Sequence, residues 1–246
     1  MAYGFEASTG NLLERTGMVS GVTEEFTYDA ADRIVASGNS DDDDLISYDA
    51  GGNITERTTL GNYYYGTSRP HAVTAVDNAA GCMSAEQQQV VYNAYGKAAQ
   101  VTSGTYLMNV TYGPDRERWK FVLQHGDTII RTTVYADGYE RITENGVTRH
   151  FYYLDSGALY MLEDGQTEGT FYYAMTDHLG SITALCDSTG TDVFRVSYDV
   201  WGCQQVTLNS IGLHRGYTGH EMLPELGLIN MNGRMYDPET DRKSVV

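Results

Sequence analysis

One short segment of the chain contains the three residue types of a serine-hydrolase triad. It reads Asp177-His178-Leu179-Gly180-Ser181. A triad needs side chains that converge from separate segments, whereas neighbouring residues of a strand point to opposite faces of a sheet. We therefore interpret this segment as a structural motif and assign it no catalytic residue.

A second pattern has the beginning of a metal site. His220-Glu221 starts like the His-Glu-x-x-His motif of zinc proteases, in which two histidines one helical turn apart bind the metal. Pro224 occupies the position of the second histidine and would also break the helix. No ligand spacing is found among the histidines His71, His125, His150 and His214. The sequence therefore predicts no zinc site.

Two further candidates for ligand binding are weak. The aspartates of residues 41–44 could bind calcium through clustered carboxylates, but a solvated acidic loop between two hairpins is the favoured interpretation. Gly96-Lys97 is followed by Ala98 instead of Ser or Thr, so no phosphate-binding loop is indicated. We predict neither a bound metal nor a cofactor.

Charge and segment composition exclude several classes of partner. The chain has 16 basic and 33 acidic residues and a net charge of −17, which would repel nucleic-acid phosphates and anionic lipid. No run of 18 apolar residues occurs, so no membrane span is expected, and the first residues lack the features of a signal peptide. Cys82, Cys186 and Cys203 are odd in number and widely spaced, so they predict no disulfide framework and leave the redox compartment open.

The composition favours β-structure. Apolar residues make up 41% of the chain, which is enough for a core, and Tyr accounts for 20 aromatic residues against 6 Phe and 2 Trp. Tyrosine packs well on a half-buried strand while its hydroxyl reaches water or a polar partner. The chain has 27 Gly and only 4 Pro, which indicates tight turns instead of proline-rich linkers.

Five segments repeat one pattern centred on a tyrosine. They are residues 26–34, 46–54, 90–98, 110–116 and 196–202, centred on Tyr28, Tyr48, Tyr92, Tyr112 and Tyr198. An apolar residue two positions earlier shares a strand face with the tyrosine. Asp or Asn after the tyrosine suits the start of a tight turn, and a glycine three residues later suits a left-handed position. Each unit is therefore predicted to be a β-hairpin with a buried tyrosine at its corner.

Other runs fill the space between the repeats with further strands. Residues 128–135, 149–154 and 169–175 are rich in β-branched and aromatic side chains, and Asn-Gly or Asp-Gly pairs separate them. One short helix-like stretch, residues 83–89, could equally be a loop. Single hairpins cannot bury their apolar faces alone. The predicted fold is therefore all-β, with stacked antiparallel hairpins that form a spiralling ribbon.

The repeats and several downstream motifs resemble the RHS/YD-repeat family, which includes shells of insecticidal toxin complexes and bacterial polymorphic toxins. The downstream motifs are residues 69–74, 176–181, 198–202, 215–221 and 227–238. The resemblance implies YD repeats over residues 1–120, further hairpins over 121–170, an RHS repeat-associated core domain over 171–238 and an atypical tail over 239–246.

The family resemblance also implies a function. It implies a secreted or cell-surface β-shell whose partners are the remainder of the shell and a C-terminal toxic polypeptide, released in many members by aspartate-dependent self-cleavage. In this chain the residues after Asp237-Pro238 lack the Gly-Arg-aromatic stretch and the second Asp-Pro pair of the family. We therefore expect a structural segment of the shell that has no self-cleavage activity.

Two alternatives remain open at this stage. Trp201 and the tyrosines could form a platform for carbohydrate or protein binding in an adhesion module, although core packing is the favoured role of these side chains. A third interpretation is the remnant of an aspartate-dependent autoprotease that would act through Asp237.

Overall fold

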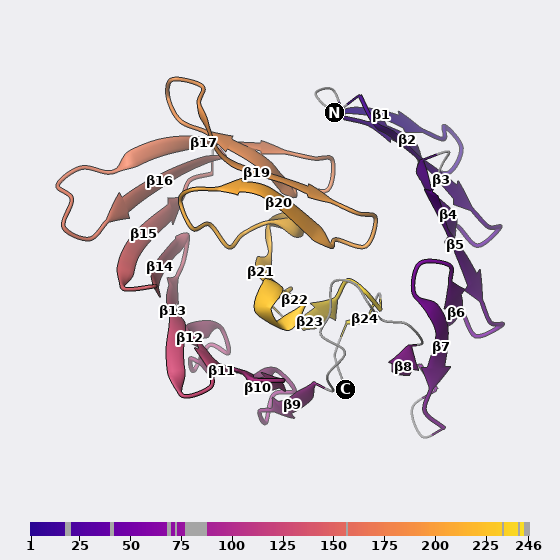
Figure 1. Ribbon diagram of the computed structural model, residues 1–246, viewed down its shortest axis with the longest axis horizontal. Coiled ribbons are helices and arrows are strands. Elements are labelled where there is room, and N and C mark those ends of the chain that lie inside the picture. Colours follow the sequence, from indigo (N-terminus) through magenta and orange to yellow (C-terminus); the bar gives the residue numbers. More distant parts are fainter. Residues whose placement is uncertain are drawn as a thin grey trace. The chain divides into compact units, whose positions relative to one another are not determined.

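The computed structural model is built almost entirely from antiparallel strands (Figure 1). It describes residues 1–17, 21–39, 42–67, 70–71, 73–76, 88–155, 157–232, 234–240 and 242–243. The all-β prediction is confirmed. The predicted helix-like stretch at 83–89 lies mostly outside the described residues, and its last residue, Gln89, begins a strand.

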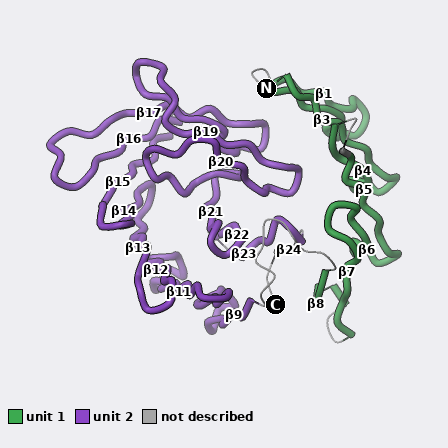
Figure 2. Tube along the Cα trace, viewed as in Figure 1, with its two compact units in different colours: residues 1–81 green, residues 82–246 purple. Residues whose placement is uncertain are grey.

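The chain divides into two compact units, residues 1–81 and 82–246 (Figure 2). The boundaries expected from the family motifs follow repeat type instead of compactness and stay a prediction. In the described residues no helix has the length and apolar character needed to cross a membrane.

The first unit is one sheet of eight strands, each paired with the next along the chain. The strands are β1 (Ala2–Phe5), β2 (Leu12–Thr16), β3 (Thr23–Tyr28), β4 (Ile34–Asn39), β5 (Asp42–Tyr48), β6 (Ile54–Arg57), β7 (Gly61–Tyr65) and β8 (Val73–Val76). This strand order is the one that consecutive hairpins produce.

The second unit contains a sheet of twelve strands in chain order. Its strands are β9 (Gln89–Tyr92), β10 (Ala98–Ser103), β11 (Tyr106–Tyr112), β12 (Arg118–His125), β13 (Thr128–Ala136), β14 (Tyr139–Glu144), β15 (Val147–Tyr153), β16 (Ala158–Glu163), β17 (Thr170–Thr176), β18 (Ile182–Cys186), β19 (Asp192–Tyr198) and β20 (Gln204–Asn209). The three additional runs predicted between the repeats correspond to β13, β15 and β17.

The sheet of the second unit curves around the C-terminal part of the chain (Figure 1). We call residues 210–240 the inner segment. It contains β21 (Glu221–Leu223), β22 (Leu228–Asn230) and β23 (Met235–Asp237), and two short 3-10 helices, η1 (Tyr217–Gly219) and η2 (Pro224–Leu226); β24 (Arg242–Lys243) completes its small sheet. These elements pack against the concave face of the larger sheet.

A five-residue turn recurs at nine places among the described residues and explains the repeat in the sequence. In each turn the first amide donates to the fifth carbonyl and the fourth amide donates to the first carbonyl. The turns begin at Asp29, Asp49, Asn93, Gly113, Leu154, Asp177, Asp187, Asp199 and Gly216. The aspartate that begins the turn also caps it with its side chain, because Asp49 Oδ1 accepts from the amides of Gly51 and Asn53 at 2.8 and 2.9 Å.

The fourth residue of each turn has a positive φ, which explains the glycine that follows Asp or Asn by three positions. Gly52, Gly96 and Gly202 have φ values of 83, 73 and 96°. Asp32 and Arg116 occupy the same position with φ values of 57 and 66°. Glycine is therefore the favoured residue there, but the turn also forms without it.

At four of the five repeats the tyrosine hydroxyl joins the hairpin to the one before it. Tyr48 Oη donates to the carbonyl of Ile34 at 2.8 Å, and Tyr112 Oη donates to that of Ala98 at 2.8 Å. The prediction that all these tyrosines are buried is wrong, because only Tyr198 is buried and Tyr92 on the edge strand β9 is 45% exposed. The hydroxyl must reach a main-chain carbonyl near the strand end, so the ring lies at the border of the core.

Candidate functional site

The inner segment packs on the concave face of the twelve-stranded sheet, and the two together form a hydrophobic core. Phe121 and Leu123 of β12 pack with Leu226 and Leu228 of the inner segment, and all four side chains are at most 2% exposed. A second cluster, formed around Phe151, contains Ile229. Alternation along each strand turns these apolar side chains toward the inner segment.

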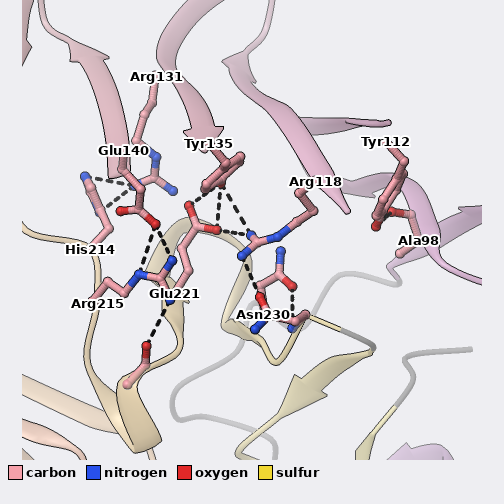
Figure 3. Close-up of polar contacts among 12 residues, drawn as sticks. Ala98, Tyr112, Arg118, Arg131, Tyr135, Glu140, His214, Arg215, Glu221 and Asn230 are labelled. Atoms are coloured by element: carbon pink, nitrogen blue, oxygen red, sulfur yellow. Dashed lines mark hydrogen bonds and ion pairs between the residues drawn. The ribbon is translucent and has the colours of Figure 1, made fainter. Parts of the chain in front are cut away.

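Charged side chains lie at inward positions of the same strands. Figure 3 shows them meeting residues of the inner segment. The buried carboxylate of Glu221 pairs with Arg118 of β12. Tyr135 Oη contacts both carboxylate oxygens of Glu221 at 2.8 Å, and Arg118 Nη2 donates to Asn232 Oδ1 at 2.8 Å.

Burial and charge act in opposite directions on this pair. Burial alone would raise the pKa of Glu221, but the adjacent Arg118 and the bond from Tyr135 lower it below its usual value. Burial together with the Glu221 charge raises the pKa of Tyr135 well above its usual value. Glu221 is therefore held as a carboxylate and Tyr135 as a neutral donor.

A second pair fastens the start of the inner segment to β14. Arg215 donates through Nε and Nη2 to Glu140 Oε1, at 2.9 and 2.5 Å, and through Nη1 to the carbonyl of Gly219 at 3.1 Å. Tyr153 Oη donates to the other oxygen, Glu140 Oε2, at 2.7 Å. Burial raises the pKa of Tyr153 well above its usual value, and the Glu140 charge raises it further. This pair repeats the arginine–glutamate–tyrosine set found at Glu221.

The third polar group surrounds Arg131, whose side chain is completely buried. Arg131 Nη1 lies 2.7 Å from His214 Nδ1 and 3.4 Å from Glu225 Oε1, and His214 Nε2 lies 3.2 Å from Glu144 Oε2. Burial would raise the pKa of Glu144, but His214 and Arg131 lower it. Nε and Nη2 of Arg131 have no hydrogen-bond partner among the described residues.

These three polar groups are suited to holding the inner segment against the twelve-stranded sheet. Glu221 and Glu140 each accept from an arginine and from a tyrosine, so their oxygens are engaged in holding the inner segment. A general acid or base needs an oxygen that can approach a reacting group. The arrangement is therefore suited to positioning the inner segment inside the curved sheet.

The triad-like segment has a structural role. Asp177 Oδ1 accepts from the amides of Leu179 and Ser181, at 2.9 and 2.8 Å, and forms the recurrent turn. The buried hydroxyl of Ser181 accepts from the amide of Thr218 at 3.1 Å. The segment therefore attaches the β17–β18 turn to the inner segment.

The zinc-like segment forms a strand instead of a helix. Glu221 begins β21, and Pro224 begins η2. His220 Nδ1 lies 2.7 Å from Thr218 Oγ1. In the described part of the chain no group of three or more His, Cys, Asp or Glu could hold a metal ion.

The expected solvated acidic loop is wrong for its last residues. Asp42–Tyr48 forms β5, and Asp44 is buried in an ion pair with Arg57 at 2.7 Å. Thr59 Oγ1 also donates to Asp44 at 2.8 Å. A long-range partner on β6 neutralises this carboxylate, which the local run of aspartates does not reveal.

Trp201 and Asp237 lie in the core of the second unit. Trp201 is 7% exposed, which confirms core packing, and its carbonyl accepts from Tyr236 Oη at 2.8 Å. Asp237 is 4% exposed, and its Oδ1 accepts from the amide of Glu239 at 2.9 Å. Cys186 and Cys203 are both outside disulfides.

Sequence reasoning missed the residues of the sheet that form polar contacts with the inner segment. Arg131, Tyr135, Glu140 and Glu144 had no motif around them. A signal was present in the alternation, because Arg131 and Tyr135 lie at even spacing on one face of β13. Charge on a face that must be buried indicates a buried partner elsewhere in the chain.

Reasoning from the repeats also missed an aromatic ladder on the opposite face of the sheet. Tyr139, Tyr152, Tyr160 and Phe171 stand opposite one another on β14 to β17, with neighbouring ring centroids 4.8 to 6.0 Å apart. Tyr152 is 39% and Phe171 49% exposed. These rings face solvent, unlike Trp201.

Comparisons with known proteins support the assignment of the repeats to the YD type. The family model Teneurin YD-shell matches residues 1–242. Over 202 residues the chain is 28% identical to the tRNA nuclease WapA of Bacillus subtilis (strain 168) and 27% identical to the tRNA3(Ser)-specific nuclease WapA of Bacillus spizizenii. These matches cover 80% of this chain but only 7% of each relative.

Solved structures share the fold at low sequence identity. A Photorhabdus luminescens Tc holotoxin pore with a mutation in TccC3 matches with a TM-score of 0.64 and 14% identity. The crystal structure of TcdB2-TccC3-Cdc42 matches with a TM-score of 0.61 and 13% identity. Both matches cover 98% of this chain, which spans 16% and 17% of the respective neighbours.

Proposed function

The chain belongs to the Teneurin YD-shell family, and we propose that it is a structural segment of a protein shell. The observation that carries this proposal is the inner segment, which fills the concave face of a twelve-stranded sheet through buried arginine–glutamate pairs. A curved ribbon closed from inside by its own C-terminal part is suited to forming one end of an enclosure. On this proposal the chain itself is not catalytic.

We further propose that the shell encloses and delivers a C-terminal toxic polypeptide. Its partners would be the remaining shell repeats and that polypeptide, and it would act outside the producing cell or on its surface. The support is the family and the likeness of fold to Tc toxin structures. The net charge of −17 argues against nucleic acid as the partner of this segment.

The test uses the coding sequence that flanks this chain in its genome. We expect it to encode further repeats upstream and a polypeptide downstream, and the product should protect that polypeptide from trypsin until the shell is denatured. The same polypeptide expressed alone is the control. Digestion at equal rates in both contexts, or flanking sequence without repeats, would contradict the proposal.

A second candidate function is binding of carbohydrate or protein by the aromatic ladder. Exposed aromatic faces stack on sugar rings and are common in protein interfaces, and Tyr152 and Phe171 expose such faces. Binding on a glycan array that is lost in the Tyr152→Ala and Phe171→Ala variants and kept in Ile129→Ala would favour this function. Ile129 is a suitable control because it is 59% exposed on another strand of the sheet.

Self-cleavage through Asp237 is the least supported alternative. It predicts a shortened product on incubation that the Asp237→Asn variant does not form. A chain that keeps its full mass during incubation would exclude this activity.

A further inference from the structure

A cavity of about 360 Å³ lies between β20 and the inner segment. It is lined by Gly202, Cys203, Gln204, Val206, Met222, Pro224, Gly227, Leu228, Ile229 and Pro238. Met222, Leu228 and Ile229 are at most 5% exposed, so the inner wall belongs to the core. The volume is in the range of pockets that bind small groups.

The lining of the cavity contains no charged side chain, which is unusual for this protein. Charged residues make up 20% of the chain, yet no Asp, Glu, Lys or Arg lines the cavity. Apolar side chains dominate the wall, and Gln204 contributes an amide. Such a cavity favours an apolar side chain and disfavours an ionic group, whose burial would need a partner.

The outer border of the cavity is the edge of a sheet. Within the described residues β20 pairs with β19 alone, so part of its main-chain N–H and C=O groups point away from the sheet. Natural edges are usually protected by charge, by proline or by a bulge. β20 has no charged residue and no proline, and its register shift lies between Val206 and Leu208, beyond the cavity.

We propose that β20 binds an extended, uncharged segment of another polypeptide, which adds a strand at Gln204–Val206 and places one apolar side chain in the cavity. A row of main-chain donors and acceptors is matched by another main chain, and recognition by strand addition combines such bonds with a side-chain pocket. The meander already adds each strand to the previous one in antiparallel order, and the new strand would continue it.

Charge argues for a different polypeptide instead of a second copy of this chain. Two copies would each bring a net charge of −17 to a short contact, whereas a neutral segment meets no such repulsion. The proposal is independent of whether the chain forms part of a shell, because it depends only on β20 and the adjacent cavity.

The direct test uses a capped fluorescent peptide, Ser-Thr-Leu-Thr-Ser, with the full chain. We expect saturable binding by fluorescence anisotropy and slower alkylation of Cys203, which lines the cavity, while alkylation of Cys186 on β18 is unchanged. A peptide with central alanine should bind roughly tenfold more weakly or worse, because it loses most of the buried apolar surface. A peptide with central aspartate should give no protection.

A pair of variants localises the binding. Val206 lines the cavity and is 45% exposed, while Leu208 on the same strand is 37% exposed and does not line it. Val206→Lys should abolish peptide binding, and Leu208→Lys should preserve it. Both side chains are partly in solvent, so both variants should keep the thermal transition of the parent chain.

Three results would overturn the proposal. These are equal binding by the leucine and aspartate peptides, unchanged binding by the Val206→Lys variant, and protection of Cys186 to the same extent as Cys203. Concentration-dependent dimerisation in sedimentation that is abolished by Val206→Lys would identify a second copy of the chain as the occupant of the cavity. This result would also reject the proposal.

Discussion

The two units use the same turn and the same tyrosine bond but bury their side chains differently. In the first unit Asp49 caps the recurrent turn and Tyr48 bonds the preceding hairpin. In the second unit Asp199 and Tyr112 do the same. The local chemistry of a hairpin is therefore independent of the unit in which it lies.

The extent of burial differs sharply. Among the described residues, all side chains that are less than 2% exposed belong to the second unit, including Phe121, Phe151 and Ile229. The most buried apolar residues of the first unit are Ile54 and Ile46, which are 3 and 4% exposed. The repeats thus build the ribbon, and a segment that follows the ribbon supplies its densest core.

The burial of ion pairs also differs between the two units, with one exception. Arg15–Glu24 in the first unit leaves the glutamate side chain 33% exposed, whereas the Arg118–Glu221 side chains are 6 and 3% exposed. Arg57–Asp44 shows that the first unit also has one well-buried pair. The two arginine–glutamate pairs allow the units to be compared with the same substitution.

The largest expected effect is on the buried pair. Glu221→Gln leaves the buried Arg118 charge without its carboxylate, and loss of one partner of such a pair costs about 3–5 kcal/mol. Glu24→Gln should cost at most about 1 kcal/mol because solvent screens that pair. The measurement is the free energy of unfolding in urea, with exchange of backbone hydrogens used to assign the loss to a unit.

Tryptophan fluorescence separates the units in this experiment. Both tryptophans, Trp119 and Trp201, lie in the second unit, so their emission reports that unit, whereas far-ultraviolet circular dichroism reports both. Glu221→Gln should shift the fluorescence transition and Glu24→Gln should leave it unchanged. Equal shifts for both variants would show that the units unfold together and would break the comparison.

Acid should weaken the second unit through the same carboxylates. The pKa values of Glu221 and Glu144 are lowered from the usual 4.5 in the folded chain, so folding favours their ionised forms. Their contribution to stability is complete above the unfolded pKa and is lost as pH falls below about 4.5 through the lowered folded values. The urea midpoint, measured by tryptophan fluorescence, should decrease as the pH is lowered through this range. Glu221→Gln should make this decrease of the midpoint with pH less steep. An equally steep decrease in the variant would reject this source of acid sensitivity.

The hairpins could be predicted because their information is local. Tyr48, Asp49 and Gly52 lie within five positions, and each has a role in one turn. The alternation of apolar residues gave the strands, as at Thr128–Ala136. The position of the tyrosine ring was predicted too deep because its hydroxyl bonds a carbonyl near the border of the core.

The site could not be predicted because its contacts are remote in sequence. Arg118 and Glu221 are 103 positions apart, and Glu140 and Arg215 are 75 apart. Alternation indicates which face a charge occupies but not which distant segment covers that face. The same reason explains Asp44, whose partner Arg57 lies on another strand.

The glycines of the recurrent turn test whether both units depend equally on local conformation. Gly96→Ala and Gly52→Ala place a side chain at φ values of 73 and 83°, which should cost about 1 kcal/mol in each unit. A methyl group at Gly96 would meet no described atom within 4 Å, and at Gly52 it would meet only Arg33 Nη1 at 3.8 Å. Hydrogen exchange in the two hairpins measures the losses. A much larger loss in one unit would mean that its turn carries more than local strain.

The smallest expected effect concerns the tyrosine hydroxyl that links successive hairpins. Tyr48→Phe and Tyr112→Phe each remove one hydrogen bond to a carbonyl and should cost roughly 0.5–1.5 kcal/mol. Tyr173→Phe is the control, because Tyr173 is 51% exposed and its hydroxyl has no hydrogen-bond partner among the described residues. Hydrogen exchange should detect the loss in the first unit, and tryptophan fluorescence should detect it in the second. Equal losses at Tyr48 and Tyr112 would sharpen the comparison, because the link between hairpins would then be common to both units and the inner segment alone would distinguish them. A loss at Tyr112 that vanishes in the Glu221→Gln background would instead mean that the bond depends on the inner segment.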